Sequence, residues 1–405
     1  MNIRMTAAAG FSAVVLAAAG AEPVAAGTHY AEEYVTPALT NGFVGGISVF
    51  TRADKCEVAL IGWADREARR PMTMDTMFRI CSQTKGVCGV AALTFVERGE
   101  LDLDDPVARY LPEFERLWIE SCSTGGVRVL TQATTPLTVR HCLTHTGGFP
   151  FSTRLNSVHG WTSVPLALEA TAAAAEPLLG EPGVTFRYSN TGIDIAAAVL
   201  EKIAGKDFET ICRERIFEPL GMTDATFYPS DEQLARAAKC YAAKTGDGEP
   251  VAHEPYTPMP DPADRRHRFA SAGAGLWCTT ADLVRFYRMI ANRGVGDNGV
   301  RVLSERSVTE YLARSLTPPG EQEYSLGINI ERKYPGWIGH GGALNTNCIL
   351  NPADGSVRLW MVQYSGSDEG LAQAYAAWER AGDAFFGERG AEGAVSTEFV
   401  GRTHE

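Results

Sequence analysis

The chain has 405 residues, 45% hydrophobic and 21% charged, which is enough for a large core and two subdomains. Its formal net charge of -12 at pH 7 argues against nucleic acid as a partner. Nine cysteines, an odd number with no regular spacing, argue against a fold built on disulfides.

The amino-terminal segment has the pattern of a signal peptide. Arg4 is a minimal basic region, and Ala7 to Ala19 is a short apolar stretch that is too short for a stable membrane span. We therefore expect residues 1–26 to be a signal peptide and the protein to be secreted or periplasmic. A packed amino-terminal helix is the alternative, and the scattered cysteines weaken the case for export.

Strand patterns occur at both ends of the chain and helical patterns between them. We expect strands at 46–50, 56–61, 325–330, 337–340, 346–350 and 357–364. A carboxy-terminal helix over 369–386 should follow the last strand. The predicted fold is therefore α/β (α+β): an antiparallel sheet of N- and C-terminal strands, flanked by helices, with an inserted mainly helical subdomain.

This organisation predicts one domain over residues 27–386. Its sheet subdomain covers about 27–81 and 315–386, its helical insert covers about 82–314, and residues 387–405 form a flexible tail. Within the insert we expect a small hairpin over 127–139 and a cleft-lining loop over 228–270.

The first candidate catalytic motif is Ser82-Gln83-Thr84-Lys85, at the head of a helix that is apolar nearly all round. Residues three apart share a helix face, so Lys85 can reach the Ser82 hydroxyl. A lysine can be the base that activates a serine only if its pKa is lowered, and a buried helix start supplies that desolvation. Taken alone, this tetrad is more often a helix N-cap followed by an ordinary lysine.

The second motif is Tyr188-Ser189-Asn190, between a Pro-Gly turn and a helical run that stops at Gly205. A phenol beside an ammonium should ionise more easily and could shuttle a proton. The Asn190 amide could hold a substrate carbonyl or orient the lysine. The competing interpretation is a core tyrosine and a helix N-cap asparagine.

The third motif is His340-Gly341-Gly342-Ala343, flanked by strand-like residues. Glycines in a strand pattern indicate close approach of a ligand or another backbone, and the strand edge could pair with an acyl substrate. The backbone N–H groups of Ala343 and Ser82 could then form an oxyanion hole. A β-bulge with a structural histidine is the alternative.

A zinc site at His141, Cys142 and His145 lacks a convincing third ligand, so we expect structural capping there. The short basic cluster at 265–268 is expected to be a solvated loop face. We expect no metal and no cofactor.

In this order, Ser82-x-x-Lys85, Tyr188-x-Asn190 and His340-Gly341-Gly342 resemble the serine β-lactamase-like, penicillin-recognising superfamily. The resemblance is greatest to the branch with class C β-lactamases, D-aminopeptidases, D,D-carboxypeptidases and family VIII esterases. It runs from about Gly46 to about Phe386, and further matching segments lie at 62–65, 101–106, 138–148, 217–222 and 273–276.

The resemblance implies a role for each motif. Ser82 would be the acylated nucleophile, Lys85 and Tyr188 would transfer protons, and Asn190 would bind the substrate carbonyl. His340 stands where lactamases usually have the lysine of Lys-Thr-Gly, and a mostly neutral histidine implies weaker recognition of anionic β-lactams.

The sequence therefore predicts a serine hydrolase that cleaves an ester or amide of a small molecule or peptide. An esterase or D-amino-acid peptidase is ranked above a β-lactamase or D,D-carboxypeptidase. A non-catalytic scaffold with the same fold is the alternative from another class, and an α/β-hydrolase is disfavoured because no Gly-x-Ser-x-Gly elbow is present.

Overall fold

The computed structural model describes residues 22–23, 29–52, 55–124, 127–159, 164–242, 250–253, 269–313 and 323–387. Most of the predicted signal peptide, the tail after Gly387, the basic cluster at 265–268 and much of the 228–270 loop lie outside these residues. Those expectations therefore stay predictions. In the described residues, no helix combines the length and apolar character that crossing a membrane would need.

Strands from both ends of the chain form one sheet, as predicted. Its order is β1-β3-β2-β14-β13-β12-β11, with β4 also paired to β3. The bounds are β1 (Glu22–Pro23), β2 (Gly45–Arg52), β3 (Lys55–Asp65), β4 (Arg70–Pro71), β11 (Asn329–Ile330), β12 (Ile338–Gly341), β13 (Asn347–Asn351) and β14 (Ser356–Met361). β2 and β14 pair antiparallel in the centre, where they join the amino- and carboxy-terminal parts.

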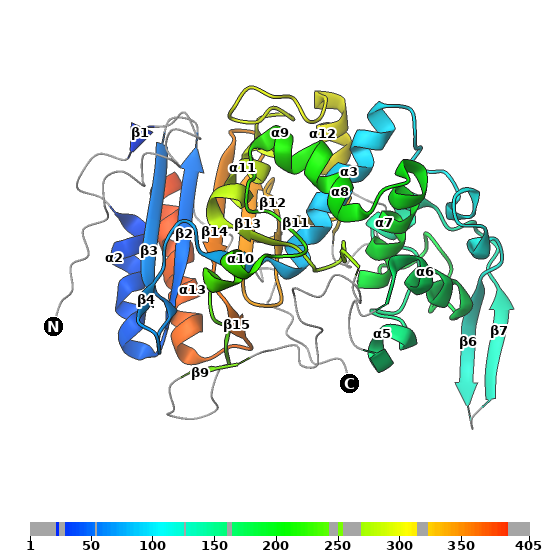
Figure 1. The fold of residues 1–405 in the computed structure, drawn as a ribbon, viewed down its shortest axis with the longest axis horizontal. Coiled ribbons are helices and arrows are strands. Elements are labelled where there is room, and N and C mark those ends of the chain that lie inside the picture. Colours follow the sequence, from blue (N-terminus) through cyan, green and yellow to red (C-terminus); the bar gives the residue numbers. More distant parts are fainter. Residues whose placement is uncertain are drawn as a thin grey trace.

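Helices cover both faces of the sheet (Figure 1). The two helices α2 (Tyr30–Val35) and α13 (Glu369–Phe386) pack on one face. There Phe50 and Trp360 from the sheet contact Trp378 of α13, with ring centroids about 6 Å apart. The other face carries the larger core, which the helical region completes. β2 is buried along nearly its whole length because apolar layers lie on both sides.

The region between the two strand groups is mainly helical. It contains α3 (Thr84–Glu97), α4 (Val139–Leu143), α5 (Arg154–His159), α6 (Leu166–Ala175), α7 (Asn190–Ala204), α8 (Phe208–Cys212), α9 (Glu218–Leu220), α10 (Asp231–Ala235), α11 (Thr280–Ala291) and α12 (Glu305–Leu312). Short helical turns lie among them, namely η2 (Cys81–Gln83), η3 (Val107–Arg109), η4 (Pro112–Phe114) and the π-turn η5 (Arg213–Phe217), whereas η1 (Thr36–Asn41) joins α2 to β2.

Three small sheets accompany these helices. They are β5 (Met77–Arg79) with β10 (Trp277–Thr279), β6 (Trp118–Thr124) with β7 (Val127–Gln132), and β8 (Tyr241–Ala242) with β9 (Val251–Ala252) and β15 (Tyr364–Ser365). The β6–β7 hairpin projects away from the body (Figure 1). The hairpin predicted over 127–139 is thus misplaced. Thr138 accepts a hydrogen bond from the His141 N–H and caps α4, so the chain turns helical where a second strand was expected.

Two of the late strands are shorter than predicted. The strand expected over 325–330 is reduced to β11, because Gly327 makes a tight turn with φ 81° against α3. A Cβ at Gly327 would lie 2.1 Å from the Lys85 carbonyl oxygen. The strand expected over 357–364 ends at Met361, and Tyr364 pairs with β8 instead. Close packing on α3 and β8 therefore overrides the local strand pattern.

Helix α3 is the buried central helix that its composition predicts, with every residue from Thr84 to Phe95 buried. Glycine lets neighbouring elements approach it closely, since a Cβ at Gly89 would lie 2.0 Å from the Leu326 carbonyl oxygen. The helix ends at Arg98 and Gly99, as predicted. The eight cysteines whose burial the structure describes are all buried and form no disulfide; they include Cys81, Cys88, Cys142 and Cys278, which we expected in the core.

Candidate active site

Ser82 lies in the one-turn helix η2, directly before α3. The preceding residue, Cys81, has φ 48°, a conformation that costs a non-glycine residue about 1–3 kcal/mol. This sharp turn carries the chain from β5 into α3. Ser82 is half-buried, whereas its neighbours Cys81 and Gln83 are buried. The serine hydroxyl is thus placed at the boundary between the core and solvent.

The Lys85 ammonium lies at the centre of the site and donates to three oxygens. Nζ is 3.1 Å from Ser82 Oγ, 2.6 Å from Asn190 Oδ1 and 2.7 Å from the carbonyl oxygen of Gly273. The Ser82–Lys85 contact is the one that the i, i+3 spacing predicts. The other two partners fix the amine so that it faces the serine hydroxyl.

Burial lowers the pKa of Lys85 from 10.5 to about 7, because a cation loses hydration in the core. The Asp194 carboxylate opposes this shift and keeps the pKa from falling further. A neutral amine is therefore accessible near pH 7. This is the condition that the sequence analysis set for Lys85 as a base.

Helix α7 carries the second motif. Ser189, not Asn190, is the N-cap: its hydroxyl accepts from the Gly192 N–H, and its own N–H donates to Nδ1 of His145. Asn190 is the first helical residue and is buried with its amide oxygen on Lys85. The capping alternative considered for Asn190 is therefore wrong, and the cap leaves its side chain free to meet the lysine.

The Tyr188 ring lies under the Lys85 ammonium, with Nζ 4.5 Å from the ring centroid. Burial raises the pKa of the Tyr188 phenol, and a hydrogen bond with Ser82 only partly offsets this shift. The expectation that Tyr188 ionises more easily is thus wrong in direction, because desolvation outweighs the nearby cation. A neutral phenol can still pass a proton along its hydrogen bond.

His340 uses both ring nitrogens within the protein. Nδ1 lies 2.6 Å from the Gly341 carbonyl oxygen and Nε2 lies 3.0 Å from the Tyr324 hydroxyl. Because a carbonyl can only accept, Nδ1 carries the hydrogen and Nε2 accepts from Tyr324. Burial lowers the pKa of His340 to about 3, so the ring is neutral.

The turn after β12 lies against the nucleophile segment. A Cβ at Gly342 would be 2.5 Å from the Ile80 carbonyl oxygen, two residues before Ser82. The Gly342 N–H donates to the Thr346 carbonyl, so Gly342 faces β13. Antiparallel strands alternate, so the N–H and C=O groups of Gly341, the last residue of β12, face the opposite edge. Ala343 follows in the turn that the Asn345 N–H closes on the Gly342 carbonyl. Among the described strands, β11 covers that edge only at Ile338 and Gly339.

Three residues that the sequence analysis did not assign to the active site also lie there: Tyr324, Asp194 and His145. The His145 ring packs between Tyr188 and Tyr324, with centroids 4.5 Å from each. Asp194 is one helical turn after Asn190 and accepts from the Gly273 N–H at 3.0 Å. A carboxylate within the apolar face of α7 is a signal that could have identified Asp194.

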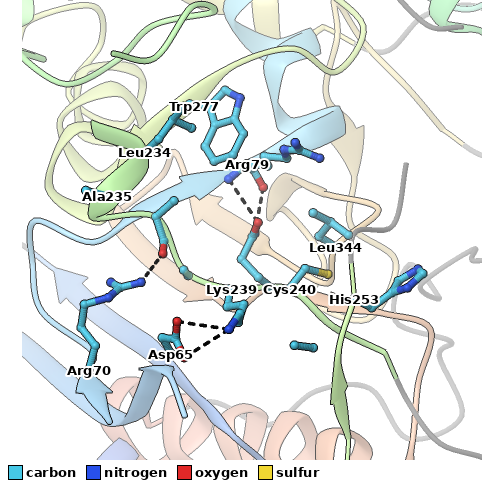
Figure 2. A pocket seen from close by; sticks show the side chains of 14 residues that line it. Asp65, Arg70, Arg79, Leu234, Ala235, Lys239, Cys240, His253, Trp277 and Leu344 are labelled. Carbon is cyan, nitrogen blue, oxygen red and sulfur yellow. Dashed lines mark hydrogen bonds and ion pairs between the residues drawn. The ribbon is translucent and has the colours of Figure 1, made fainter. Parts of the chain in front are cut away.

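A pocket of about 570 Å³ lies beside the turn that follows Ala343. Its wall includes Leu344 and Cys240, which form a small apolar cluster with Cys81. Its charged residues bond within the protein: Arg70 donates to the Ala237 carbonyl and Lys239 pairs with Asp65 (Figure 2). Ser82 does not line this pocket, so we assign the pocket no part in catalysis.

No group of three or more potential metal ligands occurs among the residues that the structure describes. At the former zinc candidate, His141 completes the capping box of α4 with Thr138. His145 Nδ1 accepts the Ser189 N–H. His141 thus has the capping role that the sequence analysis expected, whereas His145 supports the N-cap residue of α7.

A serine paired with a buried lysine, in a helical region inserted between the strands of an antiparallel sheet, defines the β-lactamase and penicillin-binding superfamily. The chain belongs to the Beta-lactamase family, whose profile matches residues 14–382. Members of this superfamily are generally serine hydrolases or acyltransferases.

Relatives and solved structures agree with this assignment. The chain is 33% identical to Protein Rv1367c of Mycobacterium tuberculosis over 75% of this chain and 74% of that protein. It is 30% identical to Esterase EstB of Burkholderia gladioli over 68% of each. Simvastatin synthase (LovD) from Aspergillus terreus matches with a TM-score of 0.73 at 23% identity, over 88% of this chain and 98% of that one. This last similarity shows the fold alone.

Proposed function

We propose that this protein hydrolyses carboxylic esters through an acyl-enzyme on Ser82. The observation that carries the proposal is the 3.1 Å contact between the Ser82 hydroxyl and a buried lysine amine with a pKa of about 7. A serine hydroxyl needs such a base in order to attack a carbonyl.

In the proposed reaction, neutral Lys85 takes the Ser82 proton as Oγ attacks the ester carbonyl. The N–H groups of Ser82 and Ala343 stabilise the resulting oxyanion. The tetrahedral intermediate collapses when the leaving alcohol takes a proton from Lys85 through the Tyr188 hydroxyl. Water then attacks the acyl-enzyme and gives one proton through the Tyr188 hydroxyl to Lys85. Lys85 returns this proton to Ser82 Oγ as the acid leaves, which restores the Ser82 hydroxyl.

The state of His340 favours esters as substrates. It disfavours both β-lactams and peptides with a free terminal carboxylate. An anionic substrate needs a cation or a free donor at this strand. His340 is neutral, Nδ1–H is committed to Gly341, and Nε2 is an acceptor already occupied by Tyr324. A D-amino-acid peptidase that does not bind a carboxylate here is the second choice among hydrolases.

The relatives support the same chemistry. EstB is named an esterase, and a protein of Penicillium decumbens, 31% identical over 69% of this chain, is named Acyltransferase calJ. An acyl-enzyme can be discharged by an alcohol as well as by water, so acyl transfer is a second candidate function. Turnover of an activated ester in rising methanol tests this: formation of the methyl ester supports transfer, and unchanged acid yield excludes it.

The test of the main proposal compares wild type, Ser82→Ala and Ser157→Ala, whose hydroxyl is exposed on α5. Each is incubated with a fluorophosphonate and measured by intact mass, and then assayed with a p-nitrophenyl ester, a cephalosporin and a D-Ala-D-Ala peptide. We expect a fluorophosphonate adduct and ester turnover in wild type and Ser157→Ala only. Full turnover by Ser82→Ala would refute the mechanism, rapid cephalosporin turnover would reverse the ranking of substrates, and no adduct at all would favour a scaffold protein.

A further inference from the structure

We infer that Asp194 is a positioning residue, which holds the Gly273 carbonyl against Lys85 and supplies the buried negative charge that balances the ammonium. This inference rests on the proposed role of Lys85 as the base. Asp194 makes no direct hydrogen bond to Lys85 in the described structure, and it acts through the peptide at Gly273.

The geometry is a relay through one residue. The Gly273 N–H donates to Asp194 Oδ1 at 3.0 Å, and the Gly273 carbonyl accepts from Lys85 Nζ at 2.7 Å. Ser271 Oγ donates to both carboxylate oxygens, at 3.1 and 3.2 Å. Asp194 therefore fixes the segment from Ser271 to Gly273 at both of its ends.

The same segment is pressed against the first turn of α7. A Cβ at Gly273 would lie 2.9 Å from both Cβ and Oδ1 of Asn190. Asn190 and Asp194 are four residues apart on α7 and share a face. Helix α7 therefore positions the Lys85 amine in two ways. Asn190 accepts a hydrogen bond from it directly, and Asp194 acts on it indirectly through the Gly273 peptide.

Asp194 is also the charged partner of Lys85 in the core. Asp194 is 3% exposed and Lys85 is 0% exposed. Its charge raises the pKa of Lys85, while burial raises the pKa of Asp194 itself to about 7. The other titratable groups around the pair are Tyr188, His145, His340, Cys81, Cys88 and Glu169. Among all of these groups, Asp194 has the largest influence that favours the protonated lysine.

The test is Asp194→Asn, which can keep the acceptor for the Gly273 N–H and removes the charge. Its control is Asp282→Asn, because Asp282 is a buried carboxylate on α11 that accepts the Asp224 N–H away from the site. The first measurement is the titration of the Lys85 side chain by ¹⁵N NMR, assigned with Lys85→Met, which needs no substrate. The second is the acid limb of kcat/KM for a p-nitrophenyl ester.

We expect Asp194→Asn to move both midpoints to lower pH by about one unit, and Asp282→Asn to move neither. Asp194→Ala, which also loses the acceptor for Gly273, should lower kcat at least tenfold, and Asp194→Asn should restore part of it. An unmoved Lys85 titration in folded Asp194→Asn would overturn the inference. A moved titration without any Ser82-dependent turnover would uphold the inference about Lys85 and refute the proposed function instead.

Discussion

The Tyr324 hydroxyl lies 3.0 Å from Nε2 of His340, and this contact completes the hydrogen bonding of a neutral imidazole. The ring therefore cannot offer a charge to a substrate without breaking a bond to Tyr324 or Gly341. Family resemblance placed His340 at a position where lysine is common in lactamases. The structure shows that the histidine at this position is hydrogen-bonded to Tyr324, 16 residues earlier in the chain.

Tyr324→Phe should destabilise the protein by about 1–3 kcal/mol, because Nε2 of His340 becomes a buried acceptor without a donor. The measurement is the free energy of unfolding in denaturant, with the ¹⁵N shifts of His340 reporting its tautomer. The matched control is Tyr311→Phe, whose hydroxyl reaches the Gly86 carbonyl at 3.3 Å inside helix α3. Since a helical carbonyl has an amide partner as well, this control should lose less stability. Equal losses would contradict a special role for the Tyr324–His340 pair.

Gly342→Ala should lower kcat about 100-fold or more, since its Cβ would meet the Ile80 carbonyl at 2.5 Å and Thr346 Oγ1 at 2.3 Å. The turn would move and carry the Ala343 N–H away from the position that the substrate carbonyl takes beside Ser82 in the proposed reaction. Gly341→Ala is the control, because its Cβ would meet nothing closer than 3.7 Å. The measurement is kcat for an activated ester alongside the thermal midpoint. Similar kcat values for the two folded variants would remove Ala343 from the proposed oxyanion hole.

Local patterns predicted the parts of the site that depend on helix geometry. The Ser82–Lys85 contact follows from a three-residue spacing, and the buried start of α3 follows from its composition. The sheet that unites both ends of the chain also followed from the order of strand patterns. The Ser82–Lys85 contact and the burial of α3 are set by neighbours in sequence. The sheet joins distant segments, but strand patterns confined to the two ends of the chain leave each group the other as its partner.

The features of the site and fold that the sequence did not reveal depend on tertiary contacts. The Gly273 carbonyl reaches Lys85 across 188 residues, and no local signal marks such a pair. Tyr188 was expected to ionise because of a nearby cation, yet its pKa is governed by burial, which only the packed structure defines. The short β11 has a similar cause, since Gly327 turns against α3 where the sequence pattern indicates a strand.

The pH dependence of the reaction should follow Lys85. In the proposed reaction the base is the neutral amine, so kcat/KM for an ester should fall as the pH drops below about 7, the pKa to which burial lowers Lys85. Lys85→Met should lose at least 100-fold in kcat, and its residual activity should lack this acid limb. The measurement is kcat/KM between pH 5 and 9 with an ester that is stable over that range. An acid limb that persists unchanged in Lys85→Met would assign it to another group.

The same pKa has a consequence for folding. Lys85 has a lower pKa in the folded protein, about 7, than the 10.5 of the unfolded chain, so between these values the unfolded chain binds more protons. The contribution of Lys85 to the free energy of unfolding therefore rises as the pH increases from 7 to 10.5. Below pH 7 the folded protein bears the full cost of burying the charged lysine. Relative to Lys85→Met, wild type should gain unfolding free energy as pH rises over this window, approaching about 1.4 kcal/mol per pH unit. Parallel curves for the two proteins in urea between pH 7 and 10 would contradict a desolvated Lys85, and with it the base that the proposed ester hydrolysis requires.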